Sequence, residues 1–122
     1  MSEALDILQS AGPLGAIEPC PENMYTVRMG GIRFEWDEKK NRQNIRKHGV
    51  SFEEAQSVFL DDHAKRFYDP DHSEDEERFL MLGVSFTLRI LVVCHCYRER
   101  DDVIRIISAR KATRQEGKHY ER

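Results

Sequence analysis

The segment Leu88–Cys96 constrains the fold of this 122-residue chain most strongly, because its residues are almost continuously apolar. Such a run is typical of a strand that is buried on both faces, at the centre of a sheet. It is preceded by a second strand-like run, Glu77–Ser85, and only a short link through Phe86–Thr87 separates the two. A link that short predicts an antiparallel hairpin. We therefore expect Glu77–Ser85 and Leu88–Tyr97 to pair at the centre of a sheet.

The stretch Asp102–Tyr120 predicts a strand that runs directly into a short helix. The alternation places Val103, Arg105, Ile107 and Ala109 on one face and Ile104, Ile106, Ser108 and Arg110 on the other. Thr113 stands three residues before Glu116, the spacing at which each side chain satisfies the other's free backbone N–H at a helix start. Arginines within such a strand either pair with acidic neighbours or bind an anion, and the pattern alone leaves both alternatives open.

A strand followed by a very polar helix is predicted near the beginning of the chain. Gly31–Trp36 alternates like a half-buried strand, and Asp37 and Gly49 are suitable caps for a helix over Glu38–His48. Ile45 is the only aliphatic residue of this helix, so we expect a thin seam through Asn41, Ile45 and His48 to face the body. A helix this polar is either a solvated face or a face that binds an anion.

The remaining segments complete a predicted single α+β domain. Ser51 and Glu54 open a second helix, Phe52–Leu60, whose apolar residues face the core, and Ala64–Tyr68 is a short strand. The predicted order is β-α-α-β-β-β-β-α, an antiparallel sheet with helices packed on it. Residues 1–23 are rich in Gly and Pro and are predicted to be a poorly ordered extension of the domain over residues 24–122.

Charge is unevenly distributed along the chain, although the formal net charge is only −3. Arg33–His48 holds six bases against three acids, and Arg98–Arg122 holds eight bases against five acids. Asp61–Glu77 instead holds eight acids and two bases. These counts predict one basic face and one acidic loop.

The cysteines and the hydropathy pattern point to a reduced, cytoplasmic protein. Cys94 and Cys96 point to the same side of a strand, where disulfide geometry is poor, and His95 points to the other side and cannot join them on one metal ion. We therefore expect no metal, no cofactor and no disulfide. There is no run of 18 apolar residues, so we expect no membrane partner either.

Phosphodiester chemistry without a metal suits the residues that remain. Guanidinium groups can grip a phosphate bidentately and stabilise the charge that develops on its oxygens. A His or Glu can take the proton of a ribose 2′-hydroxyl, and a Tyr or a second cation can protonate the leaving 5′-oxygen.

Five sequence blocks together resemble the BrnT toxins, the ribonuclease halves of bacterial type II toxin–antitoxin pairs. The blocks are Phe34–Asn41 (FEWDEKKN), Lys47–Ala55 (KHGVSFEEA), Glu77–Phe79 (ERF), Arg105–Ala112 (RIISARKA) and the pair Glu116 and Tyr120. The resemblance implies a RelE-like α+β fold and metal-independent cleavage of RNA. It also implies neutralisation by a cognate BrnA-like antitoxin that carries a DNA-binding domain, so that operator DNA is reached only through the complex.

Carried onto this sequence, the resemblance implies a site built from several segments of the chain. Its candidate catalytic residues are Lys47, His48, Arg78, Glu99, Arg105, Ser108, Arg110 and Tyr120. In this hypothesis Arg105 and Arg110 bind phosphate, and His48 or Glu99 is the base. Tyr120 orients or protonates, and Lys47 and Arg78 follow the RNA backbone.

Each of these residues also has a purely structural interpretation. His48 can cap its helix, Arg78 can pair with the acidic loop, Ser108 can be a small strand residue, and Tyr120 can pack its helix on the sheet. A non-catalytic nucleic-acid-binding module and a protein-interaction domain are the competing functions. The sequence shows no interleaved aromatic residues that would stack on splayed bases.

Overall fold

The apolar run forms strand β5 (Ile90–Arg98), which lies inside the sheet, antiparallel to both of its neighbours. The computed structural model describes residues 24–29, 31–72, 76–98 and 103–120. In this part of the chain six strands form one sheet in the order β1-β2-β6-β5-β4-β3. The predicted hairpin is confirmed, because β4 and β5 pair antiparallel from Arg78↔Cys96 to Val84↔Ile90.

The other elements follow the chain closely. The strands are β1 (Met24–Met29), β2 (Ile32–Asp37), β3 (Lys65–Tyr68), β4 (Arg78–Val84) and β6 (Val103–Lys111). The helices are α2 (Glu38–His48), α3 (Phe52–Ser57) and α4 (Arg114–Tyr120), with the 3-10 turns η2 (Val58–Leu60) and η3 (Pro70–His72). The predicted extension, residues 1–23, lies outside the described residues, and the domain boundary stays a prediction.

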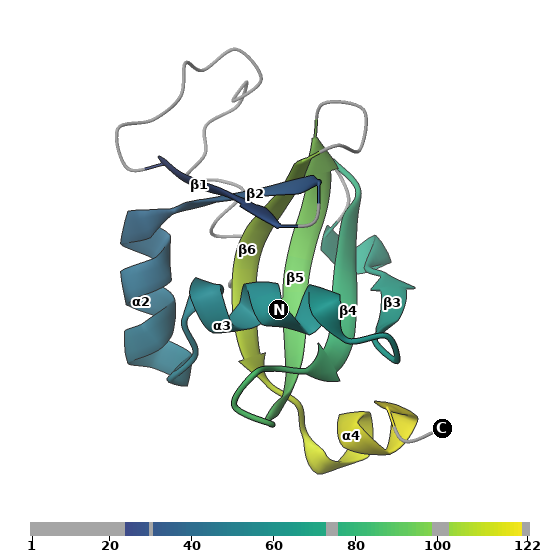
Figure 1. Ribbon diagram of the computed structural model, residues 1–122. Helices are drawn as coiled ribbons and strands as arrows, with labels where there is room; N and C mark the ends of the chain where they lie inside the picture. Colours follow the sequence, from purple (N-terminus) through teal and green to yellow (C-terminus); the bar gives the residue numbers. More distant parts are fainter. Residues whose placement is uncertain (1–23, 30, 73–75, 99–102, 121–122) are drawn as a thin grey trace.

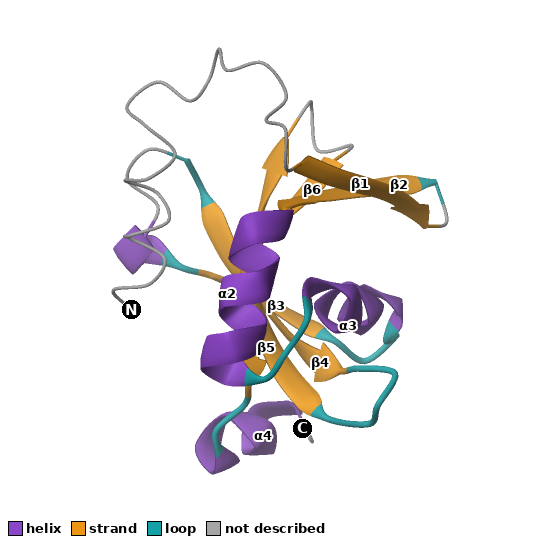
Figure 2. Cartoon of the chain, turned by 90° about the vertical axis from the view of Figure 1, so that its left-hand side faces the viewer, coloured by secondary structure: helices purple, strands orange, loops and turns teal. Residues whose placement is uncertain are grey.

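Helices α2 and α3 lie on the same face of the sheet, which we call the helix face. Figure 1 shows α3 crossing in front of β4, β5 and β6, with α2 beside it and α4 at the lower end of the sheet. The turned view in Figure 2 shows α2 and α3 still next to each other. The fully buried side chains of Phe34, Trp36, Phe52 and Val93 join the two layers into one core. We call the other side of the sheet the opposite face.

Helix α2 is attached to the body by two buried asparagines rather than by an aliphatic seam. The amide of Asn44 donates to the carbonyls of Val50 and Ala109, both at 2.8 Å, and its oxygen accepts from the N–H of Ala109 at 3.2 Å. Asn41 accepts from the N–H of Phe52 at 2.8 Å. Ile45, predicted to face the body, is instead 44% exposed. Amide side chains replace apolar ones here because they can pair with otherwise unpaired backbone groups.

The sheet differs from the prediction in two respects. It is mixed rather than wholly antiparallel, because β2 pairs with β6 in parallel through Phe34↔Ile104 and its neighbours. It also has a strand that the sequence analysis missed, β1, which pairs antiparallel with β2 from Met24↔Asp37 to Met29↔Ile32. The parallel pair follows from the position of α2 and α3 between the two strands, since a crossover through helices returns the chain in the same direction.

A β-bulge in β6 changes the predicted alternation of its side chains. Cys94 faces Ser108 while His95 faces Ile106, so Ile107 has no partner on β5. An unpaired residue shifts the facing of every side chain beyond it. Ile104, Ile106 and Ala109 consequently belong to the core of the helix face, and Ile107 packs with Cys94 and Cys96 on the opposite face. The alternation was therefore predicted correctly up to the bulge and wrongly after it.

The predicted helix caps are confirmed. The side chain of Asp37 accepts from the N–H of Lys39 at 2.8 Å, and Gly49 ends α2 with φ 71°. Ser51 accepts from the N–H of Glu54 at 3.0 Å at the start of α3. None of the described helices is long and apolar enough to cross a membrane.

The carboxylate of Glu54 connects α3 to the β4–β5 hairpin. It accepts from Nε of Arg89 at 2.9 Å and from the hydroxyl of Ser85 at 2.6 Å. These contacts keep the carboxylate ionised, and the hydrogen bond from Arg89, the largest cause, helps to lower the pKa of Glu54 to about 2. Arg89 is thereby fixed at the end of the sheet that adjoins α4.

Candidate nucleic-acid interface

Two of the predicted arginines lie in one row across the opposite face. Arg78 on β4 faces Cys96 on β5, and Cys96 faces Arg105 on β6. Arg105 in turn faces Glu35 on the parallel strand β2. Backbone pairing of four strands therefore fixes Arg78 and Arg105 on either side of one cysteine.

Glutamates connect the arginines of this row. Arg105 binds Glu35 through Nε at 2.9 Å and Nη2 at 2.8 Å, and Arg78 binds Glu76 at 3.1 Å. Arg98 lies between the two glutamates, 3.7 Å from Glu35 and 3.9 Å from Glu76. The side chain of Arg78 is only 2% exposed. These pairs agree with the structural interpretation of the arginines.

The next row of the opposite face holds Cys94 and Ser108. The thiol of Cys94 hydrogen-bonds with Ser108 and Arg78, but burial dominates and raises its pKa to about 11. Burial likewise raises the pKa of Cys96 to about 12. Both thiols are therefore protonated at neutral pH and are poor nucleophiles. His95 lies on the helix face against Phe59, as predicted, so it does not share a site with the cysteines.

Arg110 lies farther along the opposite face and holds α4 in place. Its partner Val92 is four residues from the partner of Arg105 on β5, which corresponds to about 13 Å along the strand. Arg110 binds Glu116 with two hydrogen bonds of 2.8 and 2.9 Å. The predicted exchange between Thr113 and Glu116 is confirmed, with bonds of 2.8 and 3.1 Å. The hydrogen bonds from Arg110, first among the causes, lower the pKa of Glu116 to about 2.

Tyr120 fixes the other end of α4. Its hydroxyl donates to Oδ2 of Asp61 at 2.7 Å, and the same oxygen accepts from the N–H of Val84 at 2.9 Å. The hydrogen bond to Asp61 raises the pKa of the Tyr120 phenol, so the phenol stays protonated at neutral pH. The backbone carbonyl of His119 also accepts from Nζ of Lys65 at 2.6 Å. These contacts agree with the interpretation in which Tyr120 packs its helix against the body.

Lys47 and His48 form the last residues of α2, with Lys47 exposed and His48 half-buried. Gly49 follows them, and its carbonyl accepts from Nη2 of Arg89 at 3.1 Å. The end of α2 therefore lies next to Arg89, and both lie near the end of the sheet that carries α4.

A groove of about 500 Å³ opens at this end of the sheet, and we call it the basic groove. It is lined by Arg89, Ile90, Lys111, Ala112, Thr113, Arg114, Gly117 and Lys118. Four of these described lining residues are cationic and none is acidic. Two neighbouring segments supply the cations, because the N–H of Ala112 donates to the carbonyl of Ile90 at 2.9 Å and so joins the start of β5 to the approach to α4.

The structure thus separates the predicted site residues into two regions. Arg78, Arg105 and Ser108 lie together on the opposite face. Lys47, His48, Arg110 and Tyr120 belong to elements near the end of the sheet that carries the basic groove. Glu99 lies outside the described residues. The roles given to all eight residues stay predictions.

The sequence analysis missed the groove cations Arg89, Lys111, Arg114 and Lys118. The dense run Arg110–Arg114 (RKATR) was the available signal for two of them. Arg89 gave no such signal, because it reaches the groove only through the hairpin turn. Among the described residues, no three His, Cys, Asp or Glu side chains are grouped closely enough to hold a metal ion.

Comparisons with known proteins agree on a single family. The family model described as "Ribonuclease toxin, BrnT, of type II toxin-antitoxin system" matches residues 36–116. Among solved structures, the chain is similar to the Brucella abortus ribonuclease toxin BrnT, with 28% identity and a TM-score of 0.51. That match covers 65% of this chain and 94% of the Brucella chain. The comparison with curated proteins gave no match. The chain therefore belongs to the BrnT family of ribonuclease toxins of type II toxin–antitoxin systems.

Proposed function

We propose that this toxin cleaves RNA by attack of a ribose 2′-hydroxyl on the adjacent phosphate, with that phosphate bound in the basic groove and no metal ion in the reaction. The observation that carries the proposal is the charge of the groove, whose described lining has four cations and no carboxylate. An RNA backbone is a regular array of negative charges, and such a groove attracts it irrespective of sequence.

The chemistry requires positive charge where the phosphate becomes more negative. When the O2′–P bond forms and the P–O5′ bond breaks, negative charge develops on the non-bridging oxygens and on the leaving oxygen. The guanidinium of Arg114 and the ammonium groups of Lys111 and Lys118 can stabilise this charge without a metal. The products are a 2′,3′-cyclic phosphate and a 5′-hydroxyl.

His48 is the residue that we assign as general base. It ends α2 next to Gly49, whose carbonyl binds the groove residue Arg89. A histidine side chain ordinarily titrates close to neutral pH and is therefore well suited to taking the 2′-hydroxyl proton. A groove lysine returns a proton to the 5′-oxygen. Arg110 and Tyr120 then act as positioning residues, since they hold α4 and its cations in place.

The double substitution Lys111→Ala and Lys118→Ala tests the groove. We expect it to lower the cleavage rate of a single-stranded RNA at least roughly a hundredfold, because two cations near the phosphate are lost. The matched control is Lys39→Ala, an exposed lysine about 12 Å from Lys47 along α2, at 1.5 Å per residue. It should leave the rate within about twofold. Cleavage is measured on labelled RNA, with and without EDTA.

Two results would contradict the proposal. Cleavage that EDTA abolishes, or that leaves 5′-phosphate ends, requires a different chemistry. A folded double variant that cleaves like the Lys39→Ala control would mean that the groove does not bind the reacting phosphate. RNA that the toxin binds in a salt-dependent manner but never cuts would support a non-catalytic binding module instead.

A type II system supplies a protein antitoxin, and we propose that a BrnA-like antitoxin inhibits by covering the basic groove. An acidic segment is the complementary partner for this surface. We further propose that the antitoxin carries a DNA-binding domain, that only the complex reaches operator DNA, and that the pair acts in the cytoplasm. A mobility shift of operator DNA by the complex, and none by the toxin alone, tests this arrangement. We also infer that the fold is RelE-like, which superposition on a RelE structure tests.

A further inference from the structure

Aromatic side chains from three strands gather at the other end of the sheet, on the helix face. Phe79 on β4 lies 5.4 Å from Tyr97 on β5 and 5.7 Å from Tyr68 on β3, measured between ring centroids. Both contacts are edge-to-face, at 67°. These residues are far apart in the sequence, which is why no interleaved aromatic motif was visible there.

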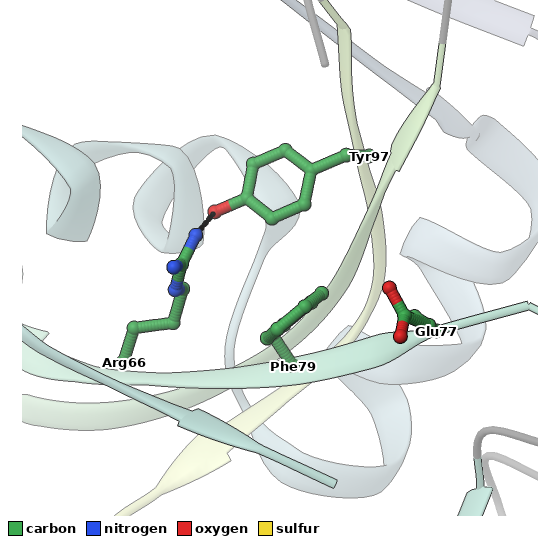
Figure 3. A pocket seen from close by; sticks show the side chains of 4 residues that line it. All are labelled: Arg66, Glu77, Phe79 and Tyr97. Carbon is green, nitrogen blue, oxygen red and sulfur yellow. Dashed lines mark hydrogen bonds between the residues drawn. The ribbon is translucent and has the colours of Figure 1, made fainter. Parts of the chain in front are cut away.

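Arg66 lies against these rings rather than against an acid. Its Cζ is 4.9 Å from the ring centroid of Phe79 and 5.6 Å from that of Tyr97. Its Nη1 donates to the hydroxyl of Tyr97 at 3.0 Å. Together with the exposed Glu77, these side chains line a pocket of about 380 Å³. Figure 3 shows Arg66 and Glu77 on either side of Phe79, with Tyr97 across from them.

The pocket has the features with which proteins bind an unstacked base. Splayed RNA bases stack on aromatic rings or on the guanidinium plane of an arginine, and their edges form hydrogen bonds with polar side chains. Arg66 and Phe79 offer such surfaces, and Glu77 is the polar group that remains to read an edge. An ionised carboxylate only accepts hydrogen bonds. Guanine is the base whose Watson–Crick edge presents two adjacent donors, N1–H and N2–H, which match the two carboxylate oxygens.

We propose that this pocket binds a guanine base of the RNA substrate, with Arg66 and the aromatic rings as the stacking surface and Glu77 as the edge reader. The inference rests on the proposed function. Tyr97 in the pocket and Ile90 in the basic groove are seven residues apart on β5, which corresponds to about 23 Å. The guanine therefore lies a few nucleotides from the cleaved bond, at a fixed offset.

The binding experiment uses four short oligouridine probes that are 2′-O-methylated throughout and therefore cannot be cleaved by 2′-hydroxyl attack. The probes carry G, A, C or U at one central position. We expect the full-length toxin to bind the guanine probe roughly tenfold more tightly than the other three in fluorescence anisotropy, as a bidentate base contact allows. Glu77→Gln should remove the preference, and Arg66→Ala should weaken the binding of all four probes.

The matched control is Asp71→Asn, which removes one exposed negative charge outside the pocket. It should keep the guanine preference. Equal affinity of the wild-type toxin for the four probes, or a preference that survives in Glu77→Gln, would overturn the proposal. Circular dichroism of each variant confirms that it is folded.

Mapping of cleavage sites separates this inference from the proposed function. The wild-type map should show guanine at a constant distance from the cut, and the Glu77→Gln map should not. A toxin that cuts RNA with no base enriched at any fixed position contradicts the pocket alone. A toxin that cuts no RNA contradicts the proposed function, and the uncleavable probes still decide the pocket.

Discussion

Leu88 has a backbone conformation that suits glycine better than leucine. It closes the β4–β5 turn with φ 66°, and its N–H donates to the carbonyl of Ser85 at 2.8 Å. The left-handed region costs a residue with a Cβ about 1–2 kcal/mol. The side chain is 84% exposed, so it recovers little of this cost through burial.

Leu88→Gly should therefore stabilise the toxin. We expect the free energy of unfolding to rise by roughly 0.5–1 kcal/mol, after the greater backbone entropy of glycine in the unfolded chain is subtracted. Urea denaturation measures the change. Leu88→Ala is the control, because it removes the exposed side chain but keeps the Cβ, and it should give no gain. Equal stabilities of the Gly and Ala variants would contradict the explanation.

His95 makes stability depend on pH. Burial lowers its pKa from 6.5 to about 4, so the folded toxin keeps it neutral while the unfolded chain protonates it below pH 6.5. The contribution is fully present above pH 6.5 and is lost as the pH falls to 4, over which it amounts to about 3 kcal/mol. Denaturation at a series of pH values should show this decrease, and His95→Phe should flatten it.

The exposed His63 provides the matched control for this measurement. His63→Gln should keep the decrease between pH 6.5 and 4. If the profile of His95→Phe stays as steep as that of the wild type, the buried imidazole is not its cause. Glu54 and Glu116, with pKa values of about 2, act at lower pH and do not confuse the test.

Among the elements, α2 is the one whose packing depends most on hydrogen bonds. Asn44→Ala removes the partners of the Val50 carbonyl and of both backbone groups of Ala109. Buried groups left without a partner cost about 1–3 kcal/mol each, so we expect a loss of roughly 3 kcal/mol in unfolding free energy. Gln43→Ala, at the exposed neighbouring position, should stay within about 0.5 kcal/mol. Thermal denaturation of both variants measures the difference.

Local signals predicted most of these elements, and long-range pairing accounts for most of the errors. Caps at Asp37, Ser51 and Thr113 act within three residues, so a sequence shows them directly. The bulge at Ile107 depends on where β6 meets β5, and no local pattern reveals it. The parallel pairing of β2 with β6 joins segments about 70 positions apart. Ile45 was misplaced because the sequence does not show that asparagines can bury themselves against backbone groups.

At the scale of the whole molecule, the chemistry is divided between two ends and two faces of one sheet. The basic groove lies at the end beside α4, and the aromatic pocket lies at the other end of the helix face. The arginine row of Arg78 and Arg105 lies on the opposite face. Residue types predicted an RNA-binding surface, but only the fold shows that Arg105 is paired with Glu35 and that Arg89 and Lys118 share a groove.

The central place of β6 has a consequence for the cell that makes this toxin. β6 is hydrogen-bonded to β2 on one side and to β5 on the other, yet it is the last strand to be synthesised. A nascent chain that ends before Val103 has two open strand edges and lacks Lys111, Arg114 and Lys118. Closing so long a loop must wait for the final segment. Each molecule therefore gains its harmful activity only as translation finishes, and chains that terminate early are harmless to their own ribosomes.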